Sequence, residues 1–162
     1  GIELYLQYSN DLFKLNTAYT YSKSYRTESG EDEYLSQYDQ THNLNIVASY
    51  KWRRWIFSSR LRYTTGNPYT PVTGAIFDGD NDVYIPIRGD FFSNRDKDFF
   101  QLDFRCDRQW IYNTWILSVY LDIQNLTSHT NSEGLNYSYD YSQSNTTSGI
   151  PIIPTLGVKG EF

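Results

Sequence analysis

The feature that most constrains the fold of this chain is a strict alternation of apolar and polar side chains. At the start of the sequence, for example, Ile2 and Leu4 share one phase while Glu3 takes the other. Comparable segments cover residues 2–8, 13–22, 44–52, 55–63, 100–107, 115–124 and 155–162. A period of two places successive side chains on opposite faces of an extended strand. Because no segment shows a helical period of similar quality, the sequence predicts an all-β, antiparallel protein.

Large aromatic residues flank three of the short turns, and all of them fall in the apolar phase. These pairs are Tyr8 and Phe13, Trp52 and Trp55, and Trp110 and Trp115. Trp and Tyr gather where a membrane meets water, so we interpret the six residues as a membrane girdle. Arg108 also falls in the apolar phase, but it stands next but one to Trp110, where a guanidinium can extend to the interface. The pattern favours a transmembrane β-barrel.

The opposite phase is too polar for a packed protein core. Its charged members in the later strands are Arg60, Arg62, Asp103, Arg105, Asp107 and Asp122. Charges are rarely buried unless they are paired, whereas a water-filled lumen solvates them. We therefore expect Arg60 and Arg62 to face the three charged residues of 103–107, and Asp122 to approach Arg105. Because exposed pairs contribute at most about 1 kcal/mol, we expect these residues to form a lumen wall or contact a plug domain rather than bind substrate tightly.

The lengths of the connections alternate in the same way as the strands. Connections after the first, third and fifth strands are short, whereas 23–40, 64–98 and 127–148 are long. Short turns on one side and long loops on the other are typical of outer-membrane barrels, with the short turns in the periplasm. We treat 135–141 as an extension of the last external hairpin, which leaves about seven crossing strands. Since bacterial single-chain barrels have an even number of strands, residues 1–162 are expected to be the C-terminal part of a larger barrel.

Composition excludes several other classes of protein. The net charge is -5, with no basic stripe, so we do not expect a nucleic-acid partner. No apolar run approaches the roughly 20 residues of a membrane helix. No arrangement of a nucleophile with a base is recognisable, so we do not expect an enzyme. Cys106 is interpreted as a small apolar residue rather than a reactive thiol, and His42 and His129 as polar residues at strand or loop ends rather than zinc ligands.

Three loop segments carry candidate binding features. Asp78, Asp80 and Asp82 alternate in a long loop and can converge on a hard cation such as Ca²⁺, although the full EF-hand spacing is absent and a solvated acidic loop is the alternative. Residues 65–71, "TGNPYTP", form either a structural turn or part of an external vestibule. The tyrosines of "YSYDY", residues 137–141, either stack on a ligand or stiffen a hairpin.

The last residues, "TLGVKGEF", resemble the C-terminal β-signal of outer-membrane proteins. The resemblance rests on a polar residue at Thr155, on Gly157, and on alternating residues that end at the aromatic Phe162. It implies that these three positions are recognised by the barrel-assembly machinery, which is therefore an expected partner.

A wider resemblance runs over essentially the whole chain. The segments "YDQTHNLNIVASYKW", "RYTTGNPYTPV" and "LDFRCDRQWIYNTWILSVYLDIQNLT" resemble the closing strands of TonB-dependent outer-membrane receptors, in which Asn125 would close the penultimate strand. The resemblance implies a barrel of about 22 strands, with the plug domain and the earlier strands lying outside this sequence.

The family resemblance also implies a function, a set of partners and a location. The function is import of a scarce solute, such as a ferric siderophore or a similar large nutrient, across the outer membrane of a Gram-negative bacterium. The implied partners are membrane lipid, lipopolysaccharide, the rest of the barrel with its plug, and TonB through the missing N-terminal part. Two alternatives stay open: a small stand-alone barrel with an adhesin or structural role, in which 135–141 is an eighth strand, and a soluble β-sandwich that binds a ligand through its tyrosine-rich loops.

Overall fold

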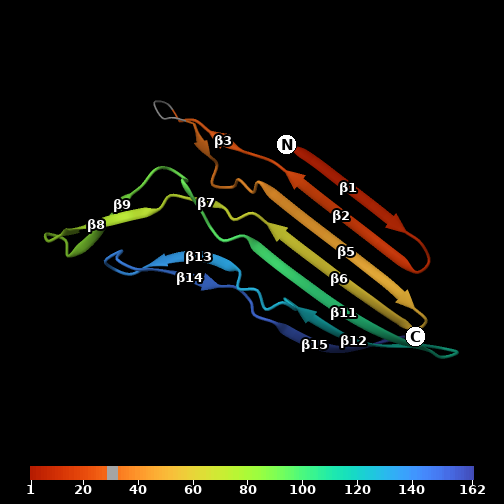
Figure 1. Ribbon diagram of the computed structural model, residues 1–162. Helices are drawn as coiled ribbons and strands as arrows, with labels where there is room; N and C mark the ends of the chain where they lie inside the picture. The colour runs from red at the N-terminus through yellow and green to blue at the C-terminus, as the bar shows by residue number, and fades with distance from the viewer. Residues whose placement is uncertain (29–32) are drawn as a thin grey trace.

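The computed structural model describes residues 1–28 and 33–162, and these residues form strands and loops without a helix. Seven long strands build one antiparallel sheet in the order β1-β2-β5-β6-β11-β12-β15 (Figure 1). They are β1 (Ile2–Ser9), β2 (Phe13–Tyr21), β5 (His42–Trp52), β6 (Trp55–Thr64), β11 (Phe99–Ile111), β12 (Ile116–Gln124) and β15 (Ile153–Glu161). The predictions of an all-β, antiparallel protein and of seven long strands are confirmed.

Short hairpins occupy the long connections between these strands. They pair β3 (Tyr25–Arg26) with β4 (Tyr34–Leu35), β7 (Pro68–Tyr69) with β10 (Asn94–Arg95), β8 (Val72–Asp78) with β9 (Val83–Arg88), and β13 (Ser132–Tyr137) with β14 (Ser144–Ser148). All four extend beyond the same end of the sheet, here called the long-loop end; the opposite end is the short-turn end (Figure 1). Residues 29–32, inside the predicted connection 23–40, lie outside the described residues.

The structure bears on two expectations about the connections. The segment 64–98, expected to be a long loop, contains β7, β8, β9 and β10, because Val, Ile and Tyr residues on both sides of the turn at 79–82 pair across it. The expectation for 135–141 is confirmed, since β13 pairs with β14 and not with the seven-stranded sheet. The hypothesis of a stand-alone barrel with 135–141 as an eighth strand is therefore wrong in this respect.

The strand register aligns side chains of one kind into rows across the sheet. One row, from β2 to β15, contains Phe13, Tyr50, Phe57, Cys106, Leu121 and Leu156. The neighbouring row, on the other side of the pleat, contains Lys14, Ser49, Ser58, Arg105, Asp122 and Thr155. Successive side chains of a strand point to opposite faces. The sheet therefore has one apolar face and one polar face.

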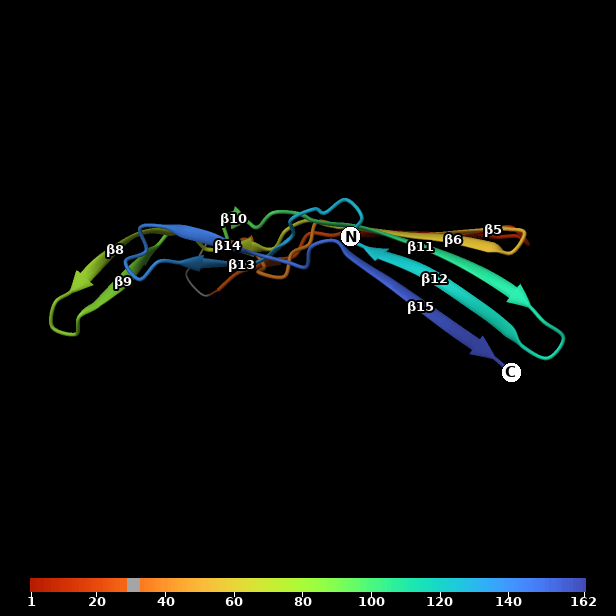
Figure 2. The same ribbon diagram turned by 90° about the horizontal axis from the view of Figure 1, so that it is seen from below.

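The apolar face is not covered by any other part of the described chain. No hydrophobic residue among the described residues is buried, and large side chains such as Leu4, Leu156 and Val158 are more than half exposed. Seen along its edge, the sheet is curved, and β11, β12 and β15 turn away from the plane of β5 and β6 (Figure 2). Within the described chain, the long strands thus form a single curved sheet with an uncovered apolar face.

The described sheet is open, with β1 and β15 as its edges. All eight residues of β1 are exposed. Both edge strands run from the long-loop end to the short-turn end, because six antiparallel pairings separate them (Figure 1).

No helix in residues 1–28 and 33–162 is long and apolar enough to cross a membrane.

Candidate functional site

The polar face carries a row of ion pairs near the middle of the sheet. The Arg60 guanidinium donates to Asp103 Oδ2 at 2.8 and 3.1 Å, across paired positions of β6 and β11. Arg105 donates to Asp107 on its own strand at 2.8 and 2.9 Å, and it lies 3.7 Å from Asp122 on β12.

One predicted charge contact differs from the expectation. Arg62 pairs with Gln101, and its guanidinium donates to the Gln101 Oε1 at 2.8 Å rather than to a carboxylate. The register explains this, because Asp103 stands opposite Arg60 and the next polar position of β11 toward the long-loop end is Gln101. Arg62 also lies against the ring of Phe99, with 5.4 Å between the guanidinium carbon and the ring centroid.

Asp103 connects three strands at the long-loop side of this row. Its side chain is nearly buried, and its Oδ1 accepts hydrogen bonds from Gln101 at 2.7 Å and from the Asn125 amide at 3.0 Å. A shallow hollow of about 250 Å³ lies between Arg60, Asp103 and Asp122.

Asn125 directly follows the end of β12 at Gln124, in agreement with what the family resemblance implies. It has a left-handed φ of 50°, which Asn tolerates better than most residues. Its side chain accepts from the His129 amide at 3.0 Å and donates to the carbonyls of His129 and Ile150 at 2.9 and 3.0 Å. Asn125 therefore joins both ends of the connection between β12 and β15.

The predicted girdle residues gather at the short-turn end. Tyr8 and Phe13 have ring centroids 6.2 Å apart, and Trp52 stands opposite Trp55. The third pair differs, because Trp110 stands opposite Leu117. Trp115 instead stacks on Tyr112 at 4.7 Å and on Phe162 at 5.8 Å.

Of the residues expected to form a C-terminal signal, Thr155 and Gly157 lie in β15 and Phe162 directly follows it. The structure gives Gly157 a steric role. A Cβ at this position would lie 2.1 Å from Tyr120 Cζ, because the Tyr120 ring crosses the backbone of β15 at this point. The Arg105 guanidinium covers the same ring, 3.9 Å from its centroid. Thr155 stands opposite Asp122, and Phe162 is fully exposed. Tyr120 is not among the site residues predicted from the sequence.

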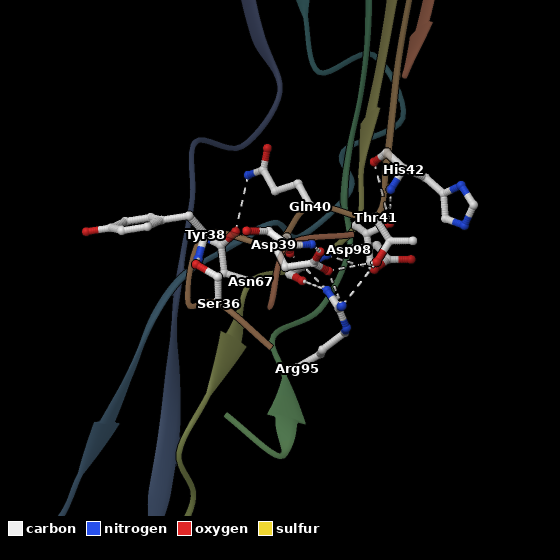
Figure 3. A network of polar contacts seen from close by, with 12 residues as sticks. Ser36, Tyr38, Asp39, Gln40, Thr41, His42, Asn67, Arg95 and Asp98 are labelled. Atoms are coloured by element: carbon white, nitrogen blue, oxygen red, sulfur yellow. Dashed lines mark hydrogen bonds and ion pairs between the residues drawn. The ribbon is translucent and has the colours of Figure 1, made fainter. Parts of the chain in front are cut away.

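Where the strands reach the long-loop end, a polar cluster joins the connections 22–41 and 64–98 (Figure 3). Its centre is Asp39, only 1% exposed, whose carboxylate accepts from Arg95, from the Ser24 amide at 2.7 Å and from Thr41 at 2.9 Å. Arg95 also donates to the carbonyl oxygens of Asp39 and Gly66 at 3.0 and 2.9 Å. We call Ser24, Asp39, Thr41, Gly66, Arg95 and Asp98 the loop junction.

The loop junction also shifts the pKa values of its carboxylates. Burial alone would raise the pKa of Asp39, but the hydrogen bonds from Arg95, Ser24 and Thr41 outweigh it and the pKa lies below 3.8. Hydrogen bonds from the Tyr63 hydroxyl and the Gly66 amide lower the pKa of Asp98 below 3.8 as well. Both groups are therefore held ionised. Gly66 is required here, since a Cβ would lie 2.0 Å from the Asp96 carbonyl oxygen.

Residues of three long connections, 22–41, 64–98 and the one between β12 and β15, line an open cavity of about 760 Å³. Aromatic rings dominate its lining, among them Tyr34, Tyr69, Phe91, Phe92, Tyr137 and Tyr141. Glu28 and Arg88 add one charge of each sign. Pockets of this size and character suit small organic ligands. Of the segments singled out in the sequence, "TGNPYTP" and "YSYDY" both contribute to the lining, whereas Phe91 and Phe92 carry no recognisable motif and were missed.

The three aspartates predicted to hold a cation do not converge. The Asp78 carboxylate accepts from the Asp80 amide at 3.1 Å and from Asn81 Nδ2 at 2.8 Å, so it closes the turn between β8 and β9. The Asp82 carbonyl accepts from Tyr139. Within residues 1–28 and 33–162, no group of three His, Cys, Asp or Glu side chains is placed to hold a metal ion.

The other singled-out residues have local partners. His42 Nδ1 lies 2.9 Å from the Tyr19 hydroxyl, and the His129 ring contacts Phe100 edge-on at 5.7 Å. Cys106 is a free, partly exposed thiol on the apolar face, paired with Phe57 and Leu121. Comparisons of the chain with family models, curated proteins and solved structures found no match.

Proposed function

We propose that this chain is the closing segment of an outer-membrane β-barrel of the TonB-dependent type, which imports a scarce solute such as a ferric siderophore or a similar large nutrient. The observation that carries the proposal is the uncovered apolar face of a curved, seven-stranded sheet. The family assignment itself rests on the sequence resemblance, and the import function follows from that assignment.

The two faces of the sheet support a membrane location. Contiguous apolar surface of this extent is avoided in water, whereas lipid solvates it. The opposite face carries Arg60, Asp103 and Arg105 in partly exposed pairs, which suit a wet interior. A soluble β-sandwich would need a second layer over Leu44, Phe57 and Val119, and these side chains are only partly buried.

The open edges support a larger barrel. Because β1 and β15 run in the same direction, pairing them with each other would be parallel. An odd number of further strands between them restores antiparallel pairing throughout and gives the even total of bacterial barrels. Unpaired edges in lipid are too costly to persist, so the rest of the barrel is expected to occupy both edges.

The first test compares two adjacent serines of β6 that point to opposite faces. Ser59 pairs with Phe104 on the apolar face, and Ser58 pairs with Arg105 on the polar face. We expect a nitroxide label at Ser59→Cys, in a Cys106→Ser background, to collide with oxygen more than with a water-soluble nickel chelate when the intact protein is in lipid vesicles. The label at Ser58→Cys should show the reverse. Equal accessibilities at both positions, or a Ser59 label shielded from both reagents, would contradict a lipid-facing side.

The second test concerns solute capture in the aromatic cavity. Phe91 and Phe77 are similarly exposed, at 53% and 51%, but only Phe91 lines the cavity, where its ring lies 5.7 Å from that of Tyr34. Loss of an aromatic contact costs about 1 kcal/mol, so we expect Phe91→Ala to weaken binding about fivefold. Phe77→Ala serves as the matched control. The measurement is energy-dependent uptake of labelled ferric siderophores by iron-starved cells. Uptake that survives collapse of the proton gradient would argue against this class of importer.

A further inference from the structure

Arg108 is a charged residue of the apolar face, near the short-turn end of the sheet. Its row across the sheet runs from Trp52 through Trp55, Arg108 and Val119 to Val158. Its strand, β11, is flanked by β6 and β12, so neither edge of the sheet is near it. Strands added at β1 or β15 would therefore leave Arg108 uncovered.

The Arg108 side chain has aromatic neighbours and no acceptor. Its guanidinium carbon lies 4.8 Å from the Trp55 ring centroid and 5.0 Å from that of Trp110. Its Nε is shut off from solvent without a hydrogen-bond partner. None of the ion pairs formed by residues 1–28 and 33–162 includes Arg108. The two rings hold the guanidinium in place, and its terminal nitrogens remain available to an anion.

A second cation, Arg53, lies in the turn between β5 and β6. Arg53 lies over Trp52, with 5.7 Å between the guanidinium carbon and the ring centroid. The turn itself is attached to β11, because the Gln109 amide donates to the Arg54 carbonyl at 2.9 Å. We call Trp52, Arg53, Trp55, Arg108 and Trp110 the Arg108 patch. It combines two guanidinium groups with three tryptophans.

From this geometry we infer that the Arg108 patch binds the phosphate of a phospholipid headgroup in the membrane leaflet nearest the short turns. The inference rests on the membrane location proposed above. Guanidinium groups bind phosphate oxygens in a bidentate manner, and tryptophan rings contact the adjoining glycerol and acyl region. A second copy of this chain is a poor occupant, because it would bring like charges together, and the plug would lie against the polar face.

The depth of Arg108 agrees with a headgroup. Arg108 is three residues from the end of β11 at Ile111. At about 3.3 Å per residue this places its Cα roughly 10 Å from the strand end, and an arginine side chain extends toward the interface from such a position. A lipid phosphate can therefore meet the guanidinium without leaving the headgroup layer.

The experiment counts phospholipid bound to the intact protein by native mass spectrometry. The protein is transferred from detergent into mixtures of a phosphatidylglycerol with a phosphate-free glycolipid of the same chain length. Wild-type protein should retain the phospholipid in preference to the glycolipid, and Arg108→Leu should lower that preference about tenfold, because a charge-assisted hydrogen bond is lost. Arg108→Lys should keep part of it. Lys51→Leu removes a cation of β5 that neighbours Trp52 but belongs to the polar phase, and it should have no effect.

Retention that is equal in wild type and Arg108→Leu would overturn the inference, as would an equal loss in Lys51→Leu. Displacement of the bound lipid by inorganic phosphate would also overturn it, since a free anion would then be the ligand. The labels at Ser58 and Ser59 distinguish this failure from failure of the proposed location. Opposite accessibilities there, with no dependence of lipid on Arg108, would remove only the lipid site; equal accessibilities would remove both proposals.

Discussion

Replacing Arg95 with methionine is expected to detach the long connections from one another while leaving the seven-stranded sheet intact. Asp39 is only 1% exposed, and the variant removes the cation that pairs with its carboxylate. The variant also removes the hydrogen bond that the Gly66 carbonyl accepts from Arg95. Removing one partner of a buried ion pair costs about 3 kcal/mol or more. Because the loss falls at the loop junction, we expect the free energy of local opening of 22–41 and 64–98 to drop by about this amount.

Hydrogen exchange of these two segments measures the effect, with Arg88→Met as the control. Arg88 is an exposed arginine of the same connection, in β9. Asp39→Asn should cost less than Arg95→Met, because Arg95 is partly exposed and can be hydrated. Unchanged exchange in Arg95→Met would show that the junction does not hold the connections.

Acidification should have the same effect as Arg95→Met. The direction of this pH dependence follows from the lowered pKa values. Asp39 and Asp98 both titrate below 3.8 in the folded protein. Their contribution to stability is present above that pH and is lost as the pH falls through the folded pKa values. Exchange, corrected for its intrinsic pH dependence, should therefore accelerate only below pH 3.8 in wild type and should change less in Asp39→Asn.

Substituting alanine for Gly157 is expected to displace the Tyr120 ring and destabilise the pairing of β12 with β15. The new Cβ would lie 2.1 Å from Tyr120 Cζ, and the ring cannot move without losing its contact with the Arg105 guanidinium. Overpacking of this kind costs about 1–3 kcal/mol. If β15 carries the C-terminal signal that the resemblance implies, assembly should also be slower.

The test is a double-mutant cycle on the unfolding of the intact protein in denaturant. Tyr120→Ala removes the obstruction, so Gly157→Ala should cost far less in that background. Gly160→Ala, in the same strand, is the matched control, because the nearest side-chain atom to its Cβ would lie at an ordinary 3.4 Å. Equal costs for the two glycines, or full additivity with Tyr120→Ala, would refute the steric account.

Particular residues show how far the sequence predicts the site. The contact between Arg60 and Asp103 could be predicted, because the two residues lie in the same phase of neighbouring strands. The partner of Arg62 was expected to be a carboxylate but is Gln101, and this depends on the strand register. The cation site at Asp78 fails because a hairpin turn uses its carboxylate. Phe91 and Arg95 carry no local pattern, and they acquire partners only when 22–41 and 64–98 meet.

The sequence alone determined the strands and their two faces, because alternation along an extended backbone is a local property that each segment carries by itself. It also determined the strand end at Asn125. Only the tertiary structure decided which side chains meet across segments far apart in the chain: the junction at Asp39, the aromatic cavity, the Tyr120 ring over Gly157, and the unpaired Arg108 between two tryptophans. These contacts depend on the strand register and on the paths of the long connections. The alternation of side chains within a single strand determines neither of them.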